Sequence, residues 1–439
     1  MAESAAKADA RLVRALGTWT LAAGIVNITV GGGIFRLPAY AAASLGSAAP
    51  LAYLACAVAM GLIVLCLAEA GSRVAVTGGP YAYVEAALGP FVGFIAGVLL
   101  WITGTFAGSA IAAALADSVE KLVPALGGGL KPGLVLLVMG ALAAVNIVGV
   151  RQSAWLNTVI TALKLLPLLL LVVVGVFSVQ WANLRLGPWP PLGQVSRTAS
   201  LLIFAFCGVE TALTPSGEVK DPAQTVPRAI GLGMAGAALV YISTQVVAQG
   251  ILGPELGSET VAPLAAAATR LFGPPGATLL LVGASVSMLG FLGGVMLAIP
   301  RALFALARDG FLPPALAAVH ARFRTPHVAI AAQSGLVGAL ALSSTFEGLA
   351  ILANLGVLML YALCCIAAWE LRRRDVRAGG RPFHWRGAAI VPPLACLSIA
   401  WVLTAIRPRE WAAFGMLLGV ASVLFLLARS RAVGDRARS

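Results

Sequence analysis

Long apolar stretches alternate with short polar segments along nearly the whole chain. A helix needs about 20 predominantly apolar residues to cross a bilayer. We expect twelve membrane-spanning helices, at residues 15–45, 48–70, 91–116, 133–150, 155–179, 198–217, 229–252, 276–300, 327–343, 349–369, 388–406 and 411–428. They occupy most of the chain and leave no room for a soluble domain. The pattern therefore predicts an all-α polytopic membrane protein.

Composition supports this prediction. The chain of 439 residues is 60% hydrophobic and 11% charged, with a mean hydropathy of +0.94. Soluble globular proteins are about 45–50% apolar and about 25% charged. The composition therefore excludes an ordinary soluble enzyme and a disordered chain. The segment around Lys7, Arg11 and Arg14 precedes a span too long for a cleavable signal peptide.

The formal charge of +13 is explained by topology rather than by nucleic acid. With the N-terminus in the cytoplasm, 21 of the 30 Lys and Arg residues fall on the inner side and seven on the outer side, while Arg36 and Lys164 lie within spans. Cytoplasmic loops carry an excess of Lys and Arg. We therefore expect both termini inside, with residues 1–14 and 429–439 as cytoplasmic tails, and contact of the basic loops with anionic lipid as a consequence.

Two of the predicted spans are interrupted. The first contains three consecutive glycines, Gly31 to Gly33, and each glycine destabilises a helix by about 1 kcal/mol relative to alanine. The sixth contains Gly208, Pro215, Gly217, Glu210 and Glu218. Unwound backbone is tolerated in a bilayer only where protein or a water-filled cavity satisfies it. We expect the two breaks to meet around a cavity; close packing at the glycines and a simple proline kink are the alternatives.

The spacing of the breaks predicts an inverted repeat. Equivalent points in spans one and six are five spans apart, so a five-span unit inserts upside down relative to its partner. This gives one repeat at 15–179, a second at 198–369, and spans eleven and twelve at 388–428. Corresponding broken helices in inverted halves indicate the binding site of a transporter.

Several motifs match a known family in order and spacing. The chain resembles the amino acid–polyamine–organocation transporter superfamily, in its prokaryotic amino acid permease type. The matching segments are Gly31–Pro38, Gly78–Tyr83 with Leu88–Pro90, Phe204–Glu210, Glu218–Pro222 with Pro227–Ile230, and Arg308–Pro313. The resemblance implies a five-plus-five inverted repeat, amino acid or amine transport by alternating access, and location in a bacterial inner membrane.

The resemblance also implies how substrate is held. Amides of Gly32, Gly33 and Ile34 are expected to face the substrate carboxylate, in agreement with the preference of helix N-termini for anions. Carbonyls of Thr29, Phe204, Ala205 and Cys207 are expected to accept the α-ammonium. The expected substrate-binding residues are Thr29, Gly31, Gly32, Gly33, Ile34, Phe204, Ala205, Cys207, Gly208 and Glu210.

Lys164 is a candidate proton carrier. It lies among leucines in the fifth span, and an ionisable residue inside a membrane marks a functional position. In the family, a lysine at this place occupies the region where sodium-coupled relatives bind a cation, and proton-coupled members use it as the protonation site. Some exchangers also carry it, so a static link from span five to carbonyls of spans one and eight stays open. Ser285 and Ser287 are its expected neighbours.

The roles of several other intramembrane residues are left open. Glu210 either braces the unwound loop or takes part in gating, and Glu218 is expected in a solvated or gating salt bridge. Phe204 and Phe206 form either an aromatic gate over the substrate or plain packing. Arg36 lines the outer vestibule or extends to the membrane surface.

Absent residue types narrow the function further. No acidic residue lies between Phe91 and Ala116, or in spans eight and ten, so a cationic substrate side chain lacks a partner. We therefore expect a neutral amino acid, carried with a proton; exchange, and a cationic amino acid or polyamine substrate, are the alternatives. No catalytic constellation, cofactor motif or zinc spacing is present among the six cysteines and three histidines, and the cysteines are expected to be reduced. Neither an enzyme nor a channel fits two broken spans as well as a carrier does, and the oligomeric state is left open.

Overall fold

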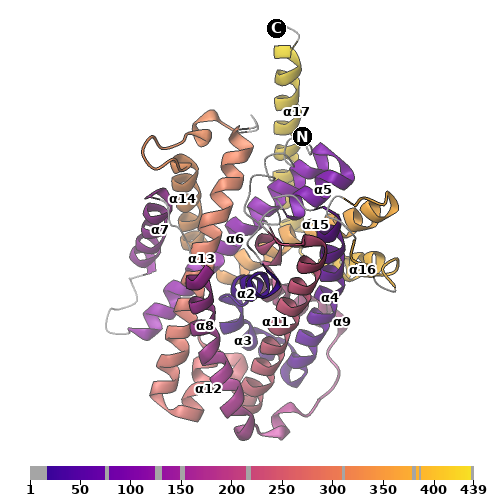
Figure 1. Cartoon of the computed structure of the whole chain (residues 1–439). Coiled ribbons are helices and arrows are strands. Elements are labelled where there is room, and N and C mark those ends of the chain that lie inside the picture. The colour runs from indigo at the N-terminus through magenta and orange to yellow at the C-terminus, as the bar shows by residue number, and fades with distance from the viewer. Residues whose placement is uncertain are drawn as a thin grey trace.

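The computed structural model describes residues 17–74, 79–123, 131–148, 154–213, 219–308, 312–377, 382–384 and 387–436. Within these ranges the chain is helical and contains no β-strand (Figure 1). The predicted tail at 1–14 lies outside the described residues, as do Pro215, Gly217 and Glu218. Of the predicted tail at 429–439, residues 429–436 continue helix α17 and residues 437–439 lie outside the described residues.

The first half of the chain holds a broken helix and four long ones. Its elements are α2 (Thr18–Thr29), η1 (Gly33–Phe35), α3 (Leu37–Leu45), η2 (Gly46–Ala48), α4 (Ala49–Arg73), α5 (Pro80–Leu88), α6 (Pro90–Leu122), α7 (Lys131–Val148), α8 (Ala154–Gly175), η4 (Val176–Ser178) and η5 (Trp181–Leu184). The short helix α5 is not among the sequence-based expectations.

The second half begins with another broken helix. Its elements are α9 (Leu192–Phe206), α10 (Val209–Ala212), α11 (Pro222–Leu252), η7 (Gly253–Ser258), α12 (Pro263–Phe272), α13 (Pro274–Arg308), η8 (Pro314–Ala317), α14 (His327–Ser343), α15 (Phe346–Arg373), α16 (Val391–Leu403) and α17 (Pro408–Arg436). Each of the twelve predicted ranges overlaps at least one helix.

The exterior of the bundle is apolar. Among the described residues, nine helical segments are long and apolar enough to cross a membrane, and α14 and α16 are shorter apolar helices. Large hydrophobic side chains such as Leu137, Leu166 and Leu239 are more than half exposed. Exposed apolar surface on this scale requires a nonaqueous environment, so the fold is that of a multi-pass membrane protein.

The broken helices lie at the centre of the bundle. In Figure 1, α2 and α3 are surrounded by α4, α6, α8, α11 and α13, and α9 lies beside α3 and α4. We call the end of the bundle with α5 and the carboxyl end of α4 the α5 end, and the opposite end, with η7 and α12, the α12 end. The helix α17 extends beyond the other helices at the top of the view.

Candidate functional site

The first break leaves three backbone amides unpaired. Helix α2 ends at Thr29, and α3 begins at Leu37. Between them, the amides of Gly32, Gly33 and Ile34 donate to no acceptor among the described residues. Buried amides without partners are rare in folded proteins. This short segment therefore presents hydrogen-bond donors that are available to a ligand.

The glycines of this segment lie in closely packed surroundings. A methyl group at Gly32 would lie 2.6 Å from Cδ1 of Ile111, and one at Gly33 would lie 3.3 Å from Cα of Ala205. The close approach of Gly33 to Ala205 joins the first break to the second.

The second break requires glycine for both conformation and space. Helix α9 ends at Phe206, and Gly208 has φ +115 before the short helix α10. L-residues with side chains rarely adopt this conformation. A methyl group at Gly208 would also lie 2.6 Å from Cγ2 of Ile28, on α2. The two interrupted helices thus pack directly against each other, as expected from the sequence.

A cavity opens between the two breaks. Its lining residues are Thr29, Gly31, Gly32, Gly33, Thr103, Gly104, Ala107, Ile111, Phe204, Ala205, Cys207, Gly208, Glu210, Thr211, Phe291 and Val295. The cavity volume is about 30 Å³, which is room for about one water molecule. An occupant larger than one or two water molecules therefore requires the walls to move apart.

Most of the predicted site residues meet at this cavity, and three do not. Ile34 is buried beside it but does not line it, Phe206 packs elsewhere, and Lys164 lies behind the first break. The sequence analysis missed the walls from α6 and α13, which supply Thr103 and Phe291. The small polar run Thr103-Gly104-Thr105 within an apolar span was the available signal.

Polar side chains in the cavity are few. The Oγ1 atom of Thr103 is buried and has no hydrogen-bond partner among the described residues. A buried hydroxyl without a partner destabilises the protein by about 1–3 kcal/mol. It is therefore a group that a polar ligand atom can satisfy.

Glu210 is the one carboxylate among the described residues that line the cavity, and it already accepts hydrogen bonds. Its Oε1 and Oε2 atoms accept hydrogen bonds from the Gly208 amide at 3.1 and 2.9 Å. The Tyr361 hydroxyl, on α15, donates to Oε2 at 2.5 Å. These contacts are the kind expected if Glu210 braces the unwound segment, which is one of the two roles expected for it.

Tyr241 links the two breaks and was not found from the sequence. Its hydroxyl, on α11, lies 2.6 Å from the carbonyl oxygens of both Thr29 and Ala205. A phenol has one proton to donate. Two of the carbonyls expected to accept the substrate ammonium are therefore already in contact with Tyr241, and Phe206 packs edge-to-face on the same ring at 5.0 Å.

Lys164 joins α8 to the first break. Its Nζ donates to the carbonyl oxygen of Asn27, and to that of Val30 at 2.7 Å. The hydroxyl of Ser287, on α13, also donates to the Val30 carbonyl, at 3.1 Å. The expected neighbour Ser285 instead bonds to Leu281 within its own helix. Lys164 is fully buried. Because its amine bonds to two carbonyls of the first break, a change in the charge of the amine alters the contacts of that backbone.

At the α12 end, a stack of side chains begins at Phe204, which lines the cavity. The rings of Phe204 and Phe346 meet edge-to-face with centroids 5.6 Å apart, and the Arg36 guanidinium lies over the Phe346 ring at 5.0 Å. Arg36 Nη1 donates to Asp117 Oδ2 at 2.9 Å, and Lys131 Nζ donates to Asp117 Oδ1 at 2.9 Å. This stack connects α3, α6, α9 and α15.

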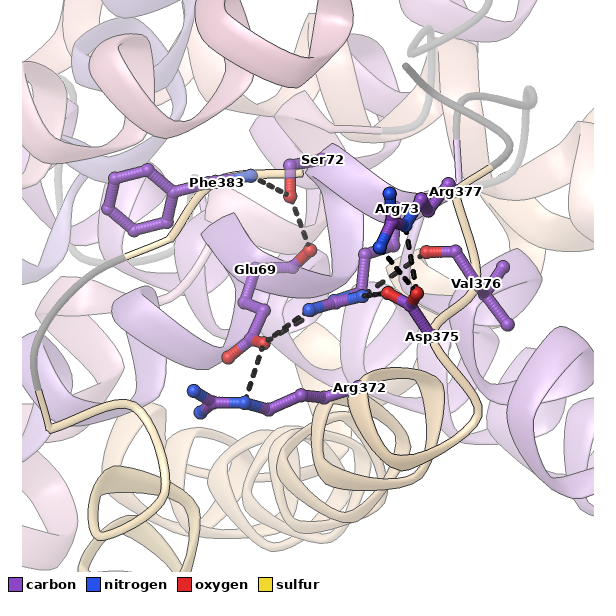
Figure 2. A network of polar contacts seen from close by, with 8 residues as sticks. All are labelled: Glu69, Ser72, Arg73, Arg372, Asp375, Val376, Arg377 and Phe383. Carbon is purple, nitrogen blue, oxygen red and sulfur yellow. Dashed lines mark hydrogen bonds and ion pairs between the residues drawn. The ribbon is translucent and has the colours of Figure 1, made fainter. Parts of the chain in front are cut away.

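At the α5 end, a buried ion network joins α4 to the end of α15 (Figure 2). Glu69 Oε1 lies 3.2 Å from Arg73 Nη2 and 3.8 Å from Arg372 Nε. Arg73 also donates to the Val376 carbonyl and lies 3.8 Å from Asp375. Hydrogen bonds from Arg377 lower the pKa of Asp375 below its usual value, which keeps this exposed carboxylate ionised.

The described residues show neither a metal-ligand cluster nor a disulfide. In the described part of the chain, no three His, Cys, Asp or Glu residues are grouped as metal ligands. All six cysteines are free, five of them buried and Cys396 half-buried.

Comparison with known proteins agrees with this geometry. An all-helical bundle with an apolar exterior and a central cavity between two interrupted helices defines a membrane carrier. The family model described as amino acid permease matches residues 16–427. The chain belongs to the amino acid permease family of the amino acid–polyamine–organocation superfamily.

Three relatives illustrate the family. An uncharacterized transporter of Mycobacterium tuberculosis is 34% identical over 423 residues, covering 93% of this chain and 92% of the relative. The branched-chain amino acid permease BcaP of Bacillus subtilis is 26% identical, covering 94% of each chain. The serine/threonine exchanger SteT of the same organism is 29% identical, covering 91% of this chain and 93% of the relative.

Proposed function

We propose that the protein is a secondary active transporter of neutral amino acids, which works by alternating access in the bacterial inner membrane. The observation that carries the proposal is the cavity between the two breaks. It is lined by Gly32 and Gly33, whose amides are unpaired and available for a carboxylate, and the unpaired amide of Ile34 follows directly after them. Its ionisable side chain, Glu210, is held by Gly208 and Tyr361, so a cationic substrate side chain finds no free partner.

The membrane arrangement belongs to the same proposal. Twelve spans form two inverted repeats, at 15–179 and 198–369, followed by a final pair at 388–428. The split of Lys and Arg, 21 against seven, supports an orientation with the α5 end and both termini in the cytoplasm and the α12 end outside.

Alternating access follows from the closed walls. A substrate enters only when the stack of Phe204, Phe346 and Arg36 opens at the α12 end. It leaves only when the helix ends tied by Glu69 separate at the α5 end. Substrate contacts that bridge the two breaks favour one arrangement over the other, as any ligand-driven change requires.

Lys164 is the proposed proton site. Release of its proton leaves the amine with fewer donors, which weakens its hydrogen bonds to the Asn27 and Val30 carbonyls. Protonation of Lys164 is thereby coupled to the backbone conformation of the first break. Amino acid exchange is the second candidate, since the same two contacts also suit a permanent charge, and a relative is named an exchanger.

Uptake into proteoliposomes tests these proposals. Radiolabelled alanine is offered with and without an inward proton gradient to wild type, to Lys164→Met and to Lys121→Met as a surface control. Symport predicts gradient-driven accumulation in wild type and the control, and its loss in Lys164→Met. Uptake that ignores the gradient and needs internal amino acid establishes exchange instead. Absence of alanine transport refutes alanine as substrate, and competition by other amino acids and amines then identifies the class.

A further inference from the structure

A second cavity lies at the α12 end, separate from the central one. It is lined by Arg36, Leu37, Tyr40, Ala43, Leu201, Gly257, Thr260, Phe346 and Glu347, and its volume is about 80 Å³. The Phe204–Phe346 ring pair separates the two cavities, because Phe204 lines the central cavity and Phe346 lines this one.

Arg36 has unused binding capacity in this second cavity. Its side chain is 10% exposed, and Nη1 is engaged by Asp117. Its Nε is buried and has no hydrogen-bond partner among the described residues. Guanidinium carries five N–H donors in a planar fork that matches a carboxylate. A buried donor without a partner is unfavourable, so a ligand oxygen at Nε relieves it.

The charge of Arg36 is also incompletely balanced. Asp117 neutralises one cation, yet both Arg36 and Lys131 bind it at 2.9 Å. Because Asp117 is shared between two cations, Arg36 keeps capacity for a second anionic group in the cavity.

Glu347 supplies the opposite charge at the mouth. It is exposed, lies in the first turn of α15 next to Phe346, and forms no hydrogen bond or ion pair with the described residues. The cavity thus places a free carboxylate at its exposed rim and a buried guanidinium inside. An α-amino acid carries the complementary pair of charges, a carboxylate and an ammonium.

We propose that this outer cavity is a second amino acid-binding site, where Arg36 binds the carboxylate and Glu347 the ammonium of the substrate before it passes Phe204. The inference rests on the proposed function, which supplies both the substrate class and the outward orientation. The volume accommodates the polar head group, and the side chain of the ligand extends toward the exposed rim.

Binding stoichiometry tests the second site. The full chain in nanodiscs is titrated with radiolabelled alanine, leucine and threonine in parallel, and the number of molecules bound per chain is measured. Wild type is expected to bind two molecules. Glu347→Gln is expected to weaken one of the two sites by about tenfold, because a charge-assisted contact is lost. Glu255→Gln, which removes an exposed carboxylate at the same end, is expected to keep both sites.

A variant of the central cavity separates the two sites. Gly32→Val adds side-chain bulk to the central cavity, against Ile111. This variant is expected to bind one molecule per chain, at the second site. Adding Glu347→Gln to it is expected to weaken the binding of that remaining molecule. Because Glu347 is exposed, its single variant tests the site even if Gly32→Val does not fold.

The outcomes also distinguish this inference from the proposed function. A wild-type protein that transports one of these amino acids but binds a single molecule, with no effect of Glu347→Gln, overturns the second site alone. A wild-type protein that neither binds nor transports any amino acid overturns the proposed function and this inference with it.

Discussion

At the residue scale, single polar atoms hold the two breaks in place. Tyr241 touches a carbonyl from each break, Tyr361 holds Glu210, and Lys164 holds the far side of the first break. Each of these side chains is fully buried. Hydrogen bonds to buried groups leave an unsatisfied partner when one side is removed, so these positions are sensitive to small changes.

Tyr241→Phe is expected to lower stability by about 1–3 kcal/mol, because the Thr29 and Ala205 carbonyls lose their buried donor. The measurement is the apparent melting temperature in detergent, together with initial uptake rate. Tyr53→Phe is the matched control, since the Tyr53 hydroxyl is buried without a partner among the described residues. Equal effects of the two substitutions would show that the bridge to the breaks contributes nothing.

Gly208→Ala is expected to destabilise the second break by about 1–3 kcal/mol, because the added methyl group meets Ile28 and the residue keeps φ at +115. Gly140→Ala, in α7, has no atom near its added methyl group and is expected to be neutral or mildly stabilising. Thermal unfolding of both variants, with uptake as a second readout, compares them. A Gly208→Ala protein as stable and active as wild type contradicts the requirement for glycine.

At the element scale, helix ends are fastened at both ends of the bundle. The carboxyl end of α4 is joined to the end of α15 through Glu69, and α3 is joined to α6 through Arg36 and Asp117. The contacts at the α5 end are the more deeply buried: the side chains of Glu69 and Arg73 are 4% and 6% exposed, against 22% for Asp117. Removal of one member of a buried pair leaves an uncompensated charge.

Glu69→Gln is expected to lower stability by about 3–5 kcal/mol, since Arg73 remains buried with its main counter-ion removed. Glu370→Gln is the control. It removes a carboxylate of the same helix end whose partners Arg373 and Arg374 are exposed, and pairs of that kind contribute about 1 kcal/mol or less. Thermal melts of the purified variants give the comparison, and similar shifts for both would contradict the buried role of Glu69.

How far the sequence predicts these elements depends on the interaction involved. Hydropathy located the apolar helices because burial in lipid imposes a length and a composition on each of them. The glycine run and Gly208 marked the breaks because backbone conformation is a local property. Tyr241 and Tyr361 were not predicted because no local pattern encodes contacts with partners 36, 212 or 151 residues away. Thr103 was not predicted because its hydroxyl has no partner among the described residues.

At the scale of the whole molecule, charge sets the orientation of the bundle in the membrane. The basic segment around Arg372 to Arg377 lies at the α5 end, and Lys121 and Lys131 lie at the other end beside α12. The excess of cations at the α5 end predicts that it faces the cytoplasm. This orientation also decides which of the two cavities substrate meets first.

Cysteine labelling checks the orientation. Arg377→Cys is expected to react with a membrane-impermeant maleimide only in inside-out vesicles, and Arg409→Cys only in right-side-out cells, because both side chains are exposed and the two positions are predicted to lie on opposite sides of the membrane. The native cysteines give low background, since five are buried and Cys396 is half-buried. Labelling of both positions from the same side would contradict the predicted topology.

The unpaired amides at Gly32, Gly33 and Ile34 bear on how such a carrier diversifies. A backbone N–H exists at every residue except proline, so point mutation alters this part of the site mainly by adding bulk or removing flexibility. Thr103 and Phe291 line the cavity with their side chains, so point mutation changes their size and polarity directly. Paralogous descendants of this chain are therefore expected to acquire new substrates by changes in α6 and α13, while the segment proposed to bind the shared head group stays almost invariant.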